Sequence, residues 1–200
     1  MKKTSWVYLL SLLFLALFIL IITVNKKKPT DVVGEAKTVY YESVEELTKK
    51  ADLIVTAIKT DEYDPVIKYS NGYPYAGYTL SAFRITSISC DHSLEYQVGD
   101  EIVVIENQFF DKQNNLVFHT AGYTMASKDE EYVLFLGISK TPGNTTLFKI
   151  LGVNLGICSV ENTYHMIPYN NEPASEFREI EQMRQEIYNR YINGELDLHQ

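Results

Sequence analysis

Glu131-Tyr132-Val133-Leu134-Phe135-Leu136 is the stretch of sequence that decides the fold. After Glu131 it leaves no polar face to meet water if the segment is extended. A strand of this kind must be covered on both sides, by other strands and by a helix. The stretch therefore predicts a central β-strand that is buried on two faces.

Further β-type segments lie on both sides of this strand in the sequence. Residues 69–77 carry Ser-Asn-Gly and Tyr-Pro, which indicate a loop or a hairpin tip. Short strands at nearly regular spacing are typical of a barrel or a sandwich rather than an α/β fold. The other predicted strands are residues 53–58, 78–88, 101–106, 116–118, 146–151, 156–160 and 164–167.

Helix signals stand near the two ends of this β-rich region. Ser43 and Glu46 form a capping box, and apolar residues follow them at helical spacing, which predicts a short leading helix. At about residues 172–193 the apolar residues recur every three or four positions, opposite a face of Glu and Arg. We expect this amphipathic helix to pack on the strands, and docking of a partner is the alternative.

The amino-terminal region predicts a membrane anchor. Residues 6–24 are apolar and uncharged, and as a helix they would span about 28 Å, close to the ~30 Å hydrocarbon core. A cleaved signal peptide would have a shorter apolar region and a small-x-small cleavage site. We therefore expect a transmembrane anchor at 1–28 that contacts the lipid bilayer through 6–24, a linker at 29–38 and a β domain at 39–200.

Lysines flank the apolar run on both sides, so the positive-inside rule gives almost no preference for either orientation in the membrane. We expect a single-pass protein of the cell membrane with a cytoplasmic amino terminus and an extracytoplasmic domain.

The charge of the chain is distributed unevenly. Residues 1–28 hold five lysines and no acid, whereas the remaining chain holds 26 acidic residues against 13 Lys and Arg. An acidic domain repels phosphates and anionic lipid headgroups. We therefore expect no nucleic acid among the partners.

Several of these segments together resemble a known family. A short helix leads into residues 51–55, a long tyrosine-rich strand and the segments 98–104 and 130–136 follow, and Gly152 and Gly156 end the pattern. Residues 40–162 thereby resemble uncharacterised secreted or membrane-anchored domains of Gram-positive bacteria. Those domains are similar to the OB-type barrel of the tissue inhibitors of metalloproteinases and to netrin-like modules.

The resemblance implies a mainly β fold, a small OB-like β-barrel, between the leading and the carboxy-terminal helix. The inhibitors chelate metal through a free amino-terminal cysteine, and no cysteine stands at that place here. The resemblance therefore implies the fold rather than the inhibitory activity.

The chain carries no motif of an enzyme. A Gly-x-Ser-x-Gly elbow, a phosphate loop, a His-Glu-x-x-His pair and a calcium loop are all missing from the sequence. We therefore predict no catalytic residue, no metal ligand and no cofactor. Three acids at residues 61–64 favour a solvated turn, because the glycine and the distal glutamate of a calcium loop are missing.

Two hypotheses for the function follow. The first is a non-enzymatic binding module for a protein or another envelope component. Its ligand-contact loop would hold Tyr69, Tyr73, Tyr75 and Tyr78, because tyrosines supply rigid contacts. The second is a cell-envelope hydrolase, whose site would require Asp91, His92 and His119 to meet in one pocket.

The two cysteines leave a further question open. Cys90 and Cys158 both lie at ends of predicted strands. In an oxidising compartment they would form a disulfide, and two separate, partly buried thiols are the alternative.

Overall fold

The computed structural model describes residues 12, 14, 27–35, 38–92, 96–139, 146–161, 167 and 174–194. The chain divides into two compact units, Met1–Thr30 and Asp31–Gln200. Of the first unit, Leu12, Phe14 and residues 27–30 are described. The second unit holds the two sheets and the helices that follow residue 40.

The second unit is mainly β. In chain order the elements are β1 (Thr30–Gly34), α2 (Val44–Lys50), β2 (Leu53–Glu62), β3 (Val66–Ser70), β4 (Tyr73–Asp91), β5 (Glu101–Glu106), β6 (Gln108–Asp111), β7 (Leu116–Thr120), β8 (Glu131–Ser139), β9 (Leu147–Ile150), β10 (Ile157–Ser159) and α3 (Ala174–Tyr191). Among the described residues the second unit holds two helices, and the strands β2 to β10 follow one another between them. Thr30, the first residue of β1, is the last residue of the first unit.

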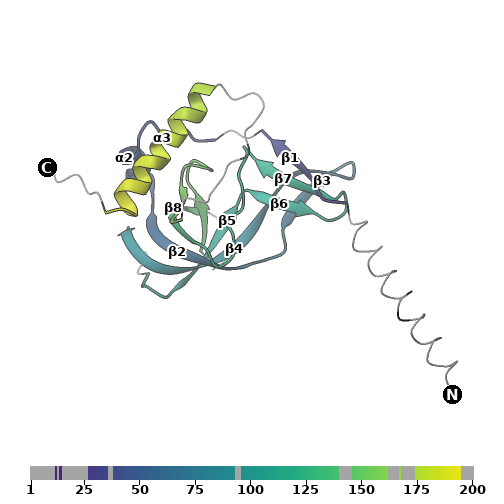
Figure 1. Cartoon of the computed structure of the whole chain (residues 1–200), viewed down its shortest axis with the longest axis horizontal. Helices are drawn as coiled ribbons and strands as arrows, with labels where there is room; N and C mark the ends of the chain where they lie inside the picture. The colour runs from purple at the N-terminus through teal and green to yellow at the C-terminus, as the bar shows by residue number, and fades with distance from the viewer. Residues whose placement is uncertain are drawn as a thin grey trace, which may run out of the picture. The chain divides into compact units, whose positions relative to one another are not determined.

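The larger sheet follows the order β10-β8-β2-β4-β5-β9, and β3 is added to the amino-terminal part of β4. β8 pairs with three strands: β2 along residues 131–136, β10 along residues 132–134 and β9 along residues 136–139. Neighbouring strands along this order are antiparallel except for β5 and β9, which are parallel. Figure 1 shows the strong curvature of β2 and β4 and the two helices close together on one side.

The smaller sheet has the order β1-β7-β6. Its strands β6 and β7 form a hairpin, and the N–H of Ala121 donates to the carbonyl of Gly34 at the end of β1 (2.8 Å). Residues 30–34 were expected to belong to a spacer, and β3 and β6 were not predicted as strands. All three are short segments that become strands through a partner strand.

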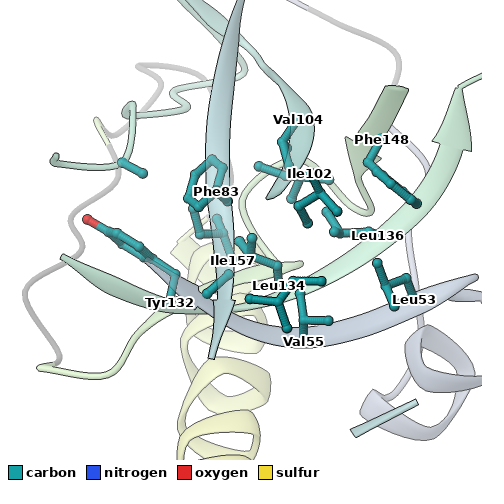
Figure 2. Packing of buried hydrophobic residues seen from close by; sticks show 14 of the residues in the cluster. Leu53, Val55, Phe83, Ile102, Val104, Tyr132, Leu134, Leu136, Phe148 and Ile157 are labelled. Carbon is teal, nitrogen blue, oxygen red and sulfur yellow. The ribbon is translucent and has the colours of Figure 1, made fainter. Parts of the chain in front are cut away.

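β8 separates two apolar clusters. Tyr132, Leu134 and Leu136 belong to a cluster among the strands, and Figure 2 shows Leu134 and Leu136 there with residues of the neighbouring strands. Val133 and Phe135 point to the other side, where the rings of Phe135 and Tyr191 of α3 meet edge to face at 5.2 Å. The predicted two-sided burial of this strand is confirmed.

The two helices lie close to where the sequence predicts them. The side chain of Ser43 caps α2 by accepting from the N–H of Glu46 (3.2 Å), and Glu46 accepts from the N–H of Glu42 (2.8 Å). The capping box is therefore present, but Glu46 accepts its return hydrogen bond from the residue before the N-cap Ser43 rather than from Ser43 itself. Arg190 of α3 donates to Glu45 of α2 (2.6 Å), which joins the helices.

The predicted membrane location requires a correction. In the part of the chain that the structure describes, no helix has both the length and the apolar character to cross a bilayer. A spanning helix needs about 20 mostly apolar residues, whereas α2 has seven residues and α3 carries Glu and Arg on one face. The single-pass location in the cell membrane is therefore contradicted. The predicted span 6–24 lies outside the described residues apart from Leu12 and Phe14, as does the predicted strand 164–167 apart from Ile167.

Candidate functional site

The predicted tyrosine loop is a β-hairpin, formed by β3 and the first residues of β4. We call residues 66–78 the aromatic arm. Its turn is Asn71-Gly72, and both residues have positive φ (51° and 81°), the geometry that two-residue hairpins favour. Tyr73 and Tyr75 are 69% and 64% exposed, Tyr69 is 43% exposed and Tyr78 is half-buried. The structure thus brings the four predicted tyrosines into one element.

A polar latch holds the arm against the β6–β7 hairpin. The buried carboxylate of Asp111 accepts from the hydroxyl of Tyr69 (2.9 Å) and from the side-chain amide of Asn114 (2.6 Å). The amide of Asn114 also reaches the carbonyl of Gly72 in the arm's turn (3.3 Å). The arm is therefore attached at its tip as well as at its base.

The latch changes the acidity of both groups. Burial alone would raise the pKa of Asp111, but hydrogen bonds from Asn114, Tyr69 and backbone N–H groups outweigh it and lower that pKa. The hydrogen bond to Asp111 raises the pKa of Tyr69. Both directions favour the observed pair, a carboxylate that accepts and a phenol that donates.

Close packing also fixes the base of the arm. A Cβ added at Gly77 would lie 2.8 Å from the ring of Phe109 and 2.9 Å from the carbonyl of Val66. Only glycine lets the arm approach β6 this closely. The tyrosines are thus presented on a preorganised support rather than on a loose loop.

A cleft of about 270 Å³ opens between the segments that flank the arm, residues 62–65 and Thr79, and the β6–β7 hairpin. Asp64 is 98% exposed at its side chain and Glu62 is 60% exposed. The nearest cation to Asp64 is the exposed ammonium of Lys112, at 3.9 Å. The lining combines apolar, polar and charged groups: Glu62, Tyr63, Asp64, Pro65, Thr79, Gln108, Phe110, Lys112, Val117 and Met125.

Glu62 connects the cleft to a buried charged network that no sequence motif predicted. The ammonium of Lys59 lies 2.8 Å from Glu106, with both side chains almost fully buried, and it also reaches Glu62 (3.3 Å). Glu106 further accepts from the hydroxyls of Ser81 and Tyr123 and from the N–H of Ala126. Every strong acceptor position of this carboxylate is used, so the network has a clear structural role in joining β2, β4 and β5 to residues 123–126.

The residues of the alternative hydrolase site lie in different regions. Asp91 pairs with Leu53 at the first residue of β2, and its carboxylate accepts from the N–H of Tyr96 (3.0 Å). The ring of His92 lies 3.3 Å from the thiol of Cys90.

His119 lies on β7, near the other end of β4. It pairs with Gln108, whose carbonyl accepts from the hydroxyl of Thr79 near the beginning of that strand. Asp91 is the last residue of the same strand, twelve positions further on. The side chain of His119 contacts Asp31 and Tyr123, whereas Asp91 contacts Tyr96 and His92 contacts Cys90. The structure therefore does not bring His119 to Asp91 and His92.

The surroundings of His119 indicate a structural role. Its Nδ1 lies 2.9 Å from the carbonyl of Tyr123 and its Nε2 lies 3.0 Å from the carboxylate of Asp31. His119 thereby joins β1 to β7 and to the segment after it.

The two cysteines are separate thiols in the structure. Cys90 lies on β4 and Cys158 on β10, with the strands β8 and β2 between them. A disulfide needs Cα atoms within about 7 Å, which is difficult to reach across two intervening strands. Burial raises the pKa of the Cys158 thiol, so it behaves as a small apolar side chain.

No metal centre can be built from the described residues: among them, no three His, Cys, Asp or Glu side chains lie close enough to hold an ion. Comparison with protein-family models finds no match for the chain, and comparison with curated proteins finds none either.

Proposed function

We propose that this domain is a non-enzymatic binding module, an OB-like β-barrel whose ligand contacts lie on the aromatic arm and in the cleft beside it. The order of strand pairing supports the barrel, because it runs from β8 through β2, β4, β5 and β9 and returns to β8. The parallel pairing of β5 and β9 within this otherwise antiparallel order agrees with a Greek-key barrel.

The arm occupies a position that suits ligand binding in such a barrel. OB-type barrels bind ligands on a strand face and through the loop between the first two strands. Here the arm is the connection between β2 and β4, the first two strands of the proposed barrel. The resemblance to netrin-like modules agrees with this fold and carries no activity to this chain.

The exposure of Tyr73 and Tyr75 is the observation that carries the proposal. Two large rings stand in solvent on a hairpin that is latched by Asp111 and packed through Gly77. Tyrosine gives large, rigid contact area at a low cost in side-chain entropy, which is why it is abundant in binding surfaces. The hydrolase alternative has no comparable support, since its residues do not meet within the described part of the chain.

A capture experiment tests the proposal. The full chain is immobilised, and the proteins it retains from a cell lysate are quantified for wild type and for Tyr73→Ser/Tyr75→Ser. The matched control is Tyr40→Ser/Val98→Ser, which removes two exposed apolar side chains outside the arm. We expect the arm variant alone to lose specific partners. Equal retention by all three proteins would contradict the proposed binding surface.

A further inference from the structure

The lining of the cleft indicates what kind of group it accepts. Tyr63 and Pro65 come from the segment before β3, and Phe110 and Val117 come from the β6–β7 hairpin. These side chains offer apolar contact, whereas Glu62 and Asp64 supply carboxylates. The matching group is amphipathic, with an apolar stem and a positively charged end.

The size of the cleft favours a side chain over a cofactor. Pockets for drug-sized molecules measure about 300–1,000 Å³ and enclose most of their ligand. This cleft measures about 270 Å³, and Pro65 and Thr79 in its lining are the chain neighbours of the two ends of the arm. A polypeptide that lies along the arm and inserts one or two side chains matches this combination better than a small molecule does.

The local charges favour a cation. Among the described residues, Lys112 is the cation that pairs with Asp64, and a pair of exposed charges at 3.9 Å is weak enough for a competing cation to replace it. Glu62 shares the single ammonium of Lys59 with Glu106, so this group of three charges is negative overall. A ligand cation at Glu62 therefore meets uncompensated negative charge.

The net negative charge of the chain beyond residue 28 also favours a basic ligand. Beyond residue 28 there are 26 acidic residues against 13 basic ones. Such an excess attracts basic partners over long range and repels the phosphates of nucleic acids. Exposed tyrosine rings also favour Lys and Arg, whose stems pack on apolar surface and whose cations are attracted by the ring face.

We therefore propose that the cleft takes a Lys or Arg side chain from a basic segment of a protein partner, and that the aromatic arm packs on the flanking residues of that segment. This inference rests on the proposed binding function and names the chemistry of its ligand. Both the cation and the apolar flanks are needed, because the carboxylates lie in the cleft and the exposed rings lie on the arm.

The test uses a short fluorescein-labelled peptide in which Lys and Arg alternate with Val and Ser, and a second peptide with Glu at the basic positions. Fluorescence anisotropy with the full chain measures both affinities. We expect the basic peptide to bind at least roughly tenfold more tightly than its acidic counterpart, and Glu62→Gln/Asp64→Asn to weaken it by roughly tenfold. Both substituted side chains are exposed, so the variant should melt like the wild type.

The control Glu42→Gln/Glu181→Gln removes the same amount of charge from exposed positions outside the cleft. It should change the affinity by less than twofold. An equal loss in the control and the cleft variant would overturn the inference, because it would show attraction by net charge alone. A basic peptide that binds no better than the acidic one would also overturn it.

The capture experiment separates this failure from a failure of the binding function. Loss of partners by Tyr73→Ser/Tyr75→Ser, together with no preference for the basic peptide, would leave the binding surface in place and reject a basic ligand. Both proposals fail if Tyr73→Ser/Tyr75→Ser retains the same partners as the wild type and Glu62→Gln/Asp64→Asn leaves the affinity for the basic peptide unchanged.

Discussion

β8 and the aromatic arm are both built from strands rich in aromatic and aliphatic side chains, yet they are held in opposite ways. β8 buries Leu134 and Phe135 in two different apolar clusters, one on each face. The arm exposes Tyr73 and Tyr75, and a latch of hydrogen bonds at Asp111 holds it in place. Apolar burial therefore stabilises one region, and a few polar contacts orient the other. Substitutions in β8 should unfold the domain, whereas those on the arm should leave it folded.

The largest effect is expected in β8. Phe135→Ala should lower the free energy of unfolding by about 3–5 kcal/mol, and Leu134→Ala by about 2–5 kcal/mol, because each leaves a cavity in a fully buried cluster. Urea unfolding of the two single variants measures both losses. A strand with one solvated face would be sensitive at only one position, so a loss below ~1 kcal/mol at either would break the comparison.

Substitutions in the buried charged network should cost less stability than those in β8 and more than those on the arm. Glu106→Leu leaves the ammonium of Lys59 without its nearest buried carboxylate, and should lower the free energy of unfolding by about 3 kcal/mol. The double variant Lys59→Met/Glu106→Leu removes both charges and should regain part of that loss. Additive losses in thermal melts would show that the two side chains do not act as a pair.

The hydrogen bonds of Asp111 predict that the stability of the domain depends on pH. The pKa of Asp111 is lowered in the folded protein, so its contribution is complete above the unfolded value of about 3.9 and disappears as the pH falls through the lower folded pKa. Asp111→Asn should lower stability by about 1 kcal/mol at neutral pH. Below about pH 4 the difference from wild type should shrink. Melting both proteins at several pH values checks this, and a constant difference down to the strongest acid would contradict it.

The smallest effect on stability is expected at the arm's exposed rings. Tyr73→Ser and Tyr75→Ser should each change the free energy of unfolding by less than ~0.5 kcal/mol, because solvent already surrounds most of both side chains. Denaturant unfolding gives the value, alongside the binding measurements on the same variants. A loss comparable to that of Leu134→Ala would mean that the arm is part of the core.

Strong local patterns allowed much of the fold to be predicted. Residues 101–106 and 131–136 are apolar enough to be recognised as strands, and the structure has both. Ser43 and Glu46 indicate the start of α2 because a helix cap involves neighbours three residues apart. The hairpin tip at Asn71-Gly72 follows from residues that accept positive φ.

The missed strands lack such patterns. Residues 30–34 are short and contain Thr, Asp and Gly, and they form β1 only because β7 offers a partner. β6 has four residues, too few to show a period. The predicted membrane location is corrected on different grounds: no helix among the described residues is long and apolar enough to cross a bilayer.

The sequence by itself therefore determined the mainly β class, the two-sided strand, the two helices and the tyrosine-rich hairpin, because periodicity and turn chemistry act between near neighbours. Only the tertiary structure decided that Asp111 latches the arm and that Lys59 meets Glu106. It also decided that His119 and Asp91 have different partners, Asp31 and Tyr123 for the one and Tyr96 for the other. The pairs Tyr69–Asp111, Lys59–Glu106 and Asp31–His119 join residues that are distant in the chain. They depend on strand order and register, which no local pattern encodes.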